Sequence, residues 1–96
     1  MRLVRFRHKA LKHLYEDGNP RGVPPAVAEK LRKLLLAIET ADTLDQLGRF
    51  PGWRLHPLKG DLKGFWSLTV TGNWRLIFHY DEETNTASEI DLIDCH

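Results

Sequence analysis

The stretch HPLKGDLKGFWSLTVTGNWRLIFHY, His56–Tyr80, decides the fold of this chain. Two runs within it, Phe65–Val70 and Trp74–Tyr80, are rich in aromatic and β-branched residues and place alternate side chains on opposite faces, which predicts two strands. The link between them, Thr71–Asn73, is short and contains a Gly and an Asn, which tolerate positive φ. The stretch therefore predicts a tight antiparallel hairpin.

Further strands are expected on both sides of this hairpin. Trp53–Leu58 and Ala87–Ile93 have strand composition, and Asp81–Thr86 is the expected loop before the last strand. Leu3–Phe6 is predicted to be a short first strand, with Leu and Val among arginines. These segments predict a sheet built mostly from the second half of the chain.

Helical periodicity occupies the first half of the chain. Lys9–Asp17 carries apolar residues at i, i+3 and i+4, and Gly18–Pro20 ends this helix, because Gly suits a C-terminal cap and Pro cannot continue it. A second helix is expected to start at Pro24 and Pro25. Its apolar stripe comprises Val27, Leu31, Leu34, Leu35 and Ile38. Thr43 and Gln46 resemble a capping box for one further turn, which buries Leu44 and Leu47 and closes at Gly48.

The predicted fold class is α+β: a small single domain, residues 1–96, whose twisted, mostly antiparallel sheet carries two N-terminal α-helices on one face. Ninety-six residues make one domain, and the apolar fraction of 42% is that of a globular protein. The lone Cys95 allows no intrachain disulfide and fits a reducing compartment. The longest apolar run is Leu34–Ile38, and no apolar segment follows the basic start, so we expect a cytoplasmic protein without a signal peptide or membrane span.

Charge is distributed unevenly along the chain. Residues 1–80 hold all 14 Lys and Arg but seven acids, whereas residues 81–96 hold six acids and no base. A basic body suits a polyanionic partner. The acidic end either protects an exposed edge strand from aggregation or meets a basic partner.

Four separated side chains form the set needed to cut an RNA phosphodiester without a metal: His56, Lys59, Arg75 and His96. RNA carries its own nucleophile, the 2′-hydroxyl, so cleavage needs a base, an acid and cations that stabilise the phosphate. Histidine suits the proton transfers because its unperturbed pKa is about 6.5. Arginine suits the phosphate because its planar, permanently charged fork binds two oxygens.

The run HPLKGD at 56–61, then GFWS at 64–67, NWR at 73–75 and a final Asp94-x-His96 resembles HigB toxins of the RelE/ParE superfamily. The resemblance covers nearly the whole chain. It implies a microbial-RNase-like fold and a toxin that cleaves messenger RNA in the ribosomal A site, with 16S rRNA nearby. It also implies a HigA-like helix-turn-helix antitoxin as partner, and operator DNA bound only through that antitoxin.

Carried over to this chain, the resemblance implies a catalytic site of His56, Lys59, Arg75 and His96, with Asp94 in support. The chain has Cys95 where relatives often have Tyr, and a thiol stacks on bases poorly, so the base preference or rate of the relatives does not carry over to this chain. The two imidazoles share the base and acid roles in either order. We expect the terminal carboxylate beside the His96 ring to favour the protonated form of the ring, which suits a general acid or an electrostatic stabiliser.

Basic side chains outside this set are candidates for docking RNA, with a steep salt dependence. The candidates come from the first strand, the first helix and the sheet, and they are Arg2, Arg5, Arg7, Lys9, Lys12, Arg54 and Lys63. Cys95 is added to the predicted RNA-binding group because of its place beside His96. The alternatives are structural: scattered solvated charge, a turn lysine at position 59, an ion pair of Arg75 with the last strand, and an inert terminus at His96. No metal-ligand spacing is present, so no metal or cofactor is expected.

Two other functions share this fold. One is a ParE-like inhibitor of DNA gyrase that acts by binding, and the other is a catalytically inactive module that binds an antitoxin. The joint presence of His56, Lys59, Arg75 and His96 favours the nuclease.

Overall fold

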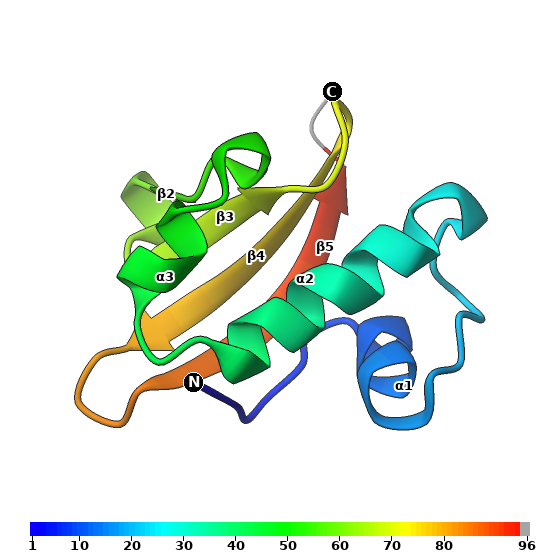
Figure 1. Ribbon diagram of the computed structural model, residues 1–96, viewed down its shortest axis with the longest axis horizontal. Helices are drawn as coiled ribbons and strands as arrows, with labels where there is room; N and C mark the ends of the chain where they lie inside the picture. Colours follow the sequence, from blue (N-terminus) through cyan, green and yellow to red (C-terminus); the bar gives the residue numbers. More distant parts are fainter. Residues whose placement is uncertain (95–96) are drawn as a thin grey trace.

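The computed structural model describes residues 1–94 and contains one five-stranded sheet in the order β1-β5-β4-β3-β2. The strands are β1 (Arg2–Leu3), β2 (His56–Pro57), β3 (Phe65–Thr69), β4 (Trp74–Asp81) and β5 (Thr86–Asp94). Strand β1 runs parallel to β5, and all other neighbours are antiparallel. Helices α1 (Lys9–Asp17) and α2 (Ala28–Thr40) lie on the same side of the sheet (Figure 1). The predicted α+β fold class is therefore confirmed.

The predicted hairpin forms the middle of the sheet. Strands β3 and β4 pair from Phe65 with His79 to Thr69 with Arg75, and the chain turns through residues 70–73. Alternate side chains of these strands enter the hydrophobic core beneath α1 and α2. They include Leu68, Leu76 and Phe78, and Val70, directly after β3, joins them; all four are fully or almost fully buried.

A β-bulge interrupts the pairing of β4 with β5. Ile77 pairs with Asp91 but His79 pairs with Ser88, so Glu89 and Ile90 together oppose the single residue Phe78. Glu89 adopts a left-handed backbone, with φ of 51°. Because the extra residue shifts the alternation, Ala87 and Ile90 both face the core although they lie three residues apart.

The helix ends agree with their predicted caps. Gly18 ends α1 in the left-handed region, with φ of 69°. Thr43 accepts a hydrogen bond from the Gln46 amide and begins α3 (Leu44–Gly48). The capping box is not reciprocal, because the Gln46 side chain accepts from the amide of Asp42 instead.

Three predicted segments need correction. The second helix begins with a 3₁₀ turn, η1 (Pro25–Val27), before α2. The first strand spans Arg2–Leu3 instead of Leu3–Phe6, although Phe6 makes an isolated bridge to Ile90. The strand expected over Trp53–Leu58 is wrong for most of its length.

The expected strand Trp53–Leu58 instead starts at the end of a 3₁₀ turn, η2 (Pro51–Trp53). The left-handed residue Arg54 (φ 48°) then redirects the chain, which leaves only His56–Pro57 as β2. A third 3₁₀ turn, η3 (Gly60–Leu62), follows β2. Within residues 1–94 there is no helix with the length and hydrophobicity that crossing a membrane requires.

Candidate functional site

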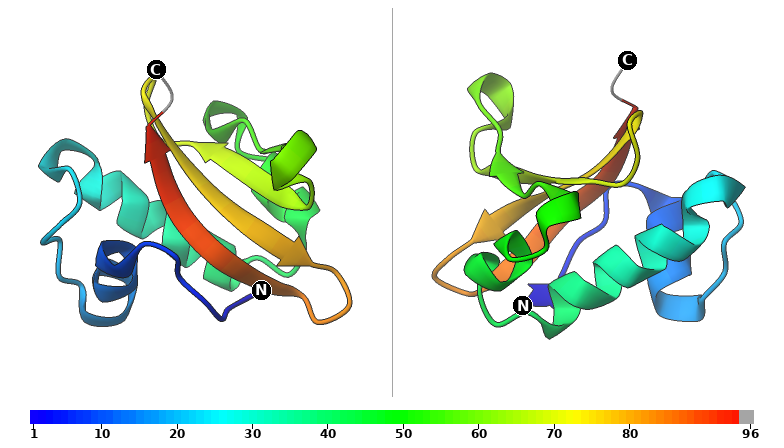
Figure 2. Two further views of the ribbon diagram at one scale, coloured as in Figure 1. Left: turned by 180° about the vertical axis from the view of Figure 1, so that it is seen from behind. Right: turned by 45° about the horizontal axis from the view of Figure 1, so that its top comes forward.

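The candidate site lies on the sheet face turned away from α1 and α2, here called the helix-free face. No helix lies over β4 and β5 on this side (Figure 2, left). The pairing register places one row of side chains across it, namely His56, Ser67, Ile77 and Asp91 on four successive strands. Ser67 and Ile77 are each 2% exposed, so the middle of the row is packed and its two ends are available for chemistry.

His56 is fixed by the irregular segment before it. The left-handed turn at Arg54 places that residue's carbonyl oxygen 2.8 Å from the His56 Nδ1. Because a carbonyl oxygen can only accept, Nδ1 carries the hydrogen of this bond. In the neutral ring the basic nitrogen is then Nε2, on an exposed imidazole at the sheet edge. The arrangement suits a general base that takes up a proton at Nε2.

Two lysines lie at the turn that follows β2. Lys59 precedes η3 and Lys63 follows it, and both are exposed. The turn is held by the Leu58 amide, which donates to the Phe65 carbonyl at 2.9 Å. The segment that forms the β2 edge of the sheet thus contains four of the predicted residues, Arg54, His56, Lys59 and Lys63.

Arg75 lies on the helix-free face, two strands from His56. It is two residues from Ile77 along β4, so its Cα is about 10 Å across the sheet and about 7 Å along it from that of His56. Its Nη1 donates to the carbonyl of Thr71 at 2.6 Å and to that of Trp74 at 3.1 Å. The guanidinium is therefore folded over the β3–β4 turn.

The end of β5 lies beside that turn (Figure 1). Asp94 pairs with Trp74, next to Arg75, but the register gives it the face of Trp74 and not that of Arg75. Two predicted site residues, Cys95 and His96, lie outside the described residues. Asp94 is the last described residue before them.

Lys9 and Lys12 lie apart from the β2 edge. Both belong to α1, which packs against α2 and β5, whereas β2 is at the opposite edge of the sheet. The structure does not bring these two lysines to His56 and Lys59. Within residues 1–94, His, Cys, Asp and Glu side chains form no group of three able to hold a metal ion.

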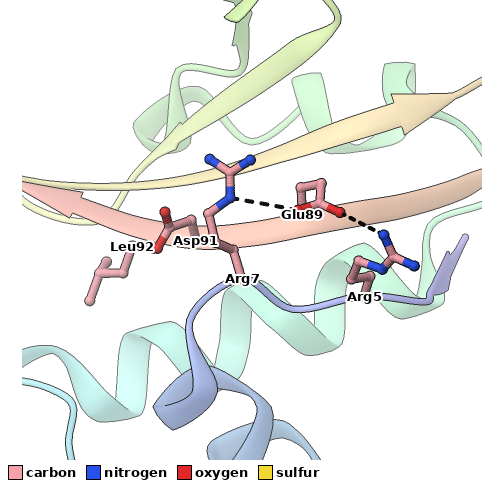
Figure 3. Close-up of polar contacts among 5 residues, drawn as sticks. All are labelled: Arg5, Arg7, Glu89, Asp91 and Leu92. Carbon is pink, nitrogen blue, oxygen red and sulfur yellow. Dashed lines mark hydrogen bonds and ion pairs between the residues drawn. The ribbon is translucent and has the colours of Figure 1, made fainter.

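A cluster that the sequence analysis did not place also occupies the helix-free face (Figure 3). Glu89, at the bulge, forms ion pairs with Arg5 at 3.4 Å and with Arg7 at 3.6 Å. The Arg7 guanidinium lies 5.8 Å from the centre of the Phe65 ring, which meets the His79 ring edge-on at 5.5 Å. Alternation alone puts Phe65 and His79 on one face, but only tertiary pairing brings Arg7 there.

Comparison with known proteins finds two relatives named HigB and a solved structure with the same fold. The chain is 45% identical over 75 residues to Endoribonuclease HigB of Proteus vulgaris, and the aligned region covers 78% of this chain and 80% of the relative. It is 33% identical over 78 residues to Toxin HigB-1 of Vibrio cholerae, covering 80% and 82%. The crystal structure of YafQ from Escherichia coli shares the fold, with a TM-score of 0.63 at 18% identity over 98% of this chain and 93% of that one.

A family model agrees with these relatives. The model, described as the RelE-like toxin HigB of type II toxin-antitoxin systems, matches residues 4–96. The match begins in the segment that pairs with β5 and runs through every element of the site. The chain therefore belongs to the HigB-like family of RelE-like toxins of type II toxin-antitoxin systems.

Proposed function

We propose that this protein is a ribosome-dependent endoribonuclease that cuts messenger RNA in the ribosomal A site by metal-free attack of a 2′-hydroxyl on the adjacent phosphate. Membership of the toxin family and the name of the Proteus vulgaris relative support RNA as substrate. The observation that carries the proposal is the hydrogen bond from the His56 Nδ1 to the Arg54 carbonyl, which leaves Nε2 as a base on the face shared with Arg75.

The reaction follows from these groups. The His56 Nε2 takes the proton of the 2′-hydroxyl, and the oxygen attacks the neighbouring phosphorus. The new 2′-oxygen–phosphorus bond forms as the bond to the 5′-oxygen breaks, which leaves a cyclic phosphate on one fragment. The departing 5′-oxygen receives a proton from an acid, and this role falls to His96 once His56 is taken as the base. Proton transfers of this kind contribute typically about 10²–10⁴-fold each.

Cations stabilise the charge that develops on the phosphate during this reaction. Lys59 lies three residues from His56 on the same edge, where its ammonium can approach a phosphate oxygen. Arg75 supplies the planar fork once its guanidinium leaves the carbonyls of the β3–β4 turn. Stabilisation of this type is usually the largest catalytic contribution. Asp94 pairs with Trp74, the neighbour of Arg75, and is the candidate for orienting an imidazole.

The partners of this function are proposed on the same basis. Membership of a type II toxin-antitoxin family supports an antitoxin, which we propose to be of the HigA helix-turn-helix type. The ribosome and its bound message are the substrate complex. Operator DNA is reached only through the antitoxin.

The test is induction of the chain without its antitoxin, followed by mapping of message 5′ ends with translation running and with translation blocked. We expect new ends within translated codons, lost on blocking translation and lost in His56→Ala. His13→Ala is the matched control, because His13 is an exposed histidine on α1, remote from β2, and its variant should cleave like the parent. Cleavage at the parental rate by His56→Ala contradicts the proposed base. Intact messages with DNA damage would point to gyrase instead.

A further inference from the structure

The Arg5–Glu89–Arg7 cluster on the helix-free face is separate from the catalytic residues proposed above. Glu89 is held at a bulge in a left-handed backbone that a glutamate rarely adopts. The bulge is fixed from the other side by the N-terminal segment, because the Ile90 amide donates to the Arg5 carbonyl at 3.1 Å and the Arg7 amide donates to the Ile90 carbonyl at 2.9 Å. The backbone therefore sets where the Glu89 carboxylate meets the two guanidinium groups.

The ion pair of Arg7 leaves the two terminal nitrogens of its guanidinium, here called the Arg7 fork, available to bind an anion. Its Nε is the atom that faces Glu89, at 3.6 Å. In Figure 3 the two terminal nitrogens point away from Glu89, across the sheet toward β4. An arginine held by Nε presents both terminal amino groups to one anion, which is the geometry that binds two oxygens of a phosphate.

The position of Arg7 relates it to the proposed cleavage site. Its guanidinium lies over Phe65, which is two residues from Ser67 on β3, and Ser67 is the strand partner of His56. Two residues along a strand correspond to about 7 Å. A hollow of about 450 Å³ lies beside the Arg7–Glu89 pair, and its lining includes Glu89, Arg5, His79, Ser88 and the carboxylate of Asp81. A strand of RNA whose scissile linkage lies at His56 can therefore continue along this face past Arg7.

We propose that Arg7 binds a phosphate of the RNA backbone next to the linkage that is cut, and that Glu89 is the positioning residue that holds its fork toward that phosphate. Arg5 shares the Glu89 carboxylate and offsets its charge. The inference rests on the proposed function for the identity of its ligand, an RNA backbone. It adds a phosphate subsite on the helix-free face that is distinct from Lys59 and Arg75.

The probe is a short single-stranded RNA in which every 2′-hydroxyl is methylated, so that it binds without being cut. Binding is measured by fluorescence anisotropy at several salt concentrations. Arg7→Gln should weaken binding several-fold and reduce the slope of log affinity against log salt by somewhat under one, about 0.7 for one lost phosphate contact on a single strand. Arg32→Gln is the matched control on α2. The Arg32 side chain is 54% exposed and forms an ion pair with Glu29 at 3.6 Å. The Arg7 side chain is 52% exposed and forms its ion pair with Glu89 at the same distance, 3.6 Å.

Glu89→Gln gives the sharper test. General electrostatic attraction predicts tighter RNA binding, because the variant loses a negative charge. Positioning predicts weaker binding, because the Arg7 fork is released. Glu89→Gly removes the same carboxylate but relieves the strain of the left-handed backbone, so this variant should be at least as stable as Glu89→Gln. If Glu89→Gly is that stable and still binds RNA weakly, partial unfolding is excluded as the cause of the weak binding.

The outcomes separate this inference from the proposed function. Loss of message cleavage in His56→Ala supports the proposed nuclease, and weaker binding of the methylated RNA by Arg7→Gln than by Arg32→Gln supports the phosphate subsite. A parental chain that binds the methylated RNA but cuts no message contradicts the proposed nuclease and leaves the Arg7 comparison to decide the subsite. The inference is overturned if Arg7→Gln binds no more weakly than Arg32→Gln, if the parent binds no more tightly than Arg7→Gln, or if Glu89→Gln binds more tightly than the parent.

Discussion

Replacing Gly64 by Ala should destabilise the protein more than its place in a surface connection suggests. Gly64 has φ of 95°, a backbone that side chains rarely adopt. A Cβ there would lie 2.8 Å from the Nε2 and 3.1 Å from the Cδ2 of the His79 ring. The Gly64 carbonyl also accepts from the Tyr80 amide at 3.2 Å, so the backbone cannot move away without loosening β4.

Two costs add in this variant. Holding Ala in a left-handed backbone costs about 1–2 kcal/mol. Overpacking against a partly buried ring costs about 1–3 kcal/mol. We therefore expect a loss of about 3 kcal/mol from an unfolding free energy of roughly 5–14 kcal/mol for a chain of this length. At about 4–8 °C per kcal/mol, the midpoint of thermal unfolding should fall by roughly 12–24 °C.

Urea unfolding followed by circular dichroism measures this loss, and two other glycines separate its parts. Gly60 has φ of 65° with no atom near its would-be Cβ, so Gly60→Ala should show the backbone cost alone. Gly72→Ala meets neither obstacle and should be nearly neutral. Adding His79→Ala to Gly64→Ala removes the clash, so the double variant isolates the contact between the two residues. The reasoning fails if Gly64→Ala costs no more than Gly60→Ala.

Three further outcomes are expected. Phe78→Ala removes a fully buried ring and should cost about 3–5 kcal/mol, read from the urea midpoint; a loss under 1 kcal/mol would contradict the packing described. Asn85→Ala removes the bonds of that side chain to the Tyr80 hydroxyl and the Asp42 carbonyl and should cost about 1–3 kcal/mol, whereas equal stability in calorimetry would show that neither bond matters. Arg75→Lys keeps the charge without the fork and should cleave about 10²-fold more slowly with unchanged thermal stability; parental cleavage would remove Arg75 from the mechanism.

The sequence predicts the centre of this fold well because local patterns determine it. The hairpin of β3 and β4 lies within one residue of its expected limits, since alternation acts over a few residues. The turn itself does not use the positive φ expected at Gly72 or Asn73. The segment before β2 was mispredicted because strand composition competes there with Pro51 and Gly52, which favour a turn. The bulge at Glu89 had a visible signal: Ala87 and Ile90 are both core residues, and a spacing of three breaks the period of a strand.

The candidate site is predictable only in part. Pairing in the sheet places His56 and Arg75 on one face, which requires a register that the sequence does not state. The left-handed turn at Arg54 that fixes the His56 ring depends on backbone geometry that composition does not reveal. The approach of Arg7 to Phe65 joins residues far apart in the chain, and such contacts depend on the whole topology.

The parallel pairing of β1 with β5 has a consequence for how the molecule is made. Arg2 pairs with Thr86, so β1 has no strand neighbour until the residues of β5 have been synthesised. Strand β5 also lies between β1 and β4, so a nascent chain still holding Thr86–Asp94 in the exit tunnel has neither the completed sheet nor the Glu89 bulge. Contacts of such long range form late. The helix-free face, which includes the Glu89 bulge, is therefore assembled only after the residues of β5 have left the ribosome.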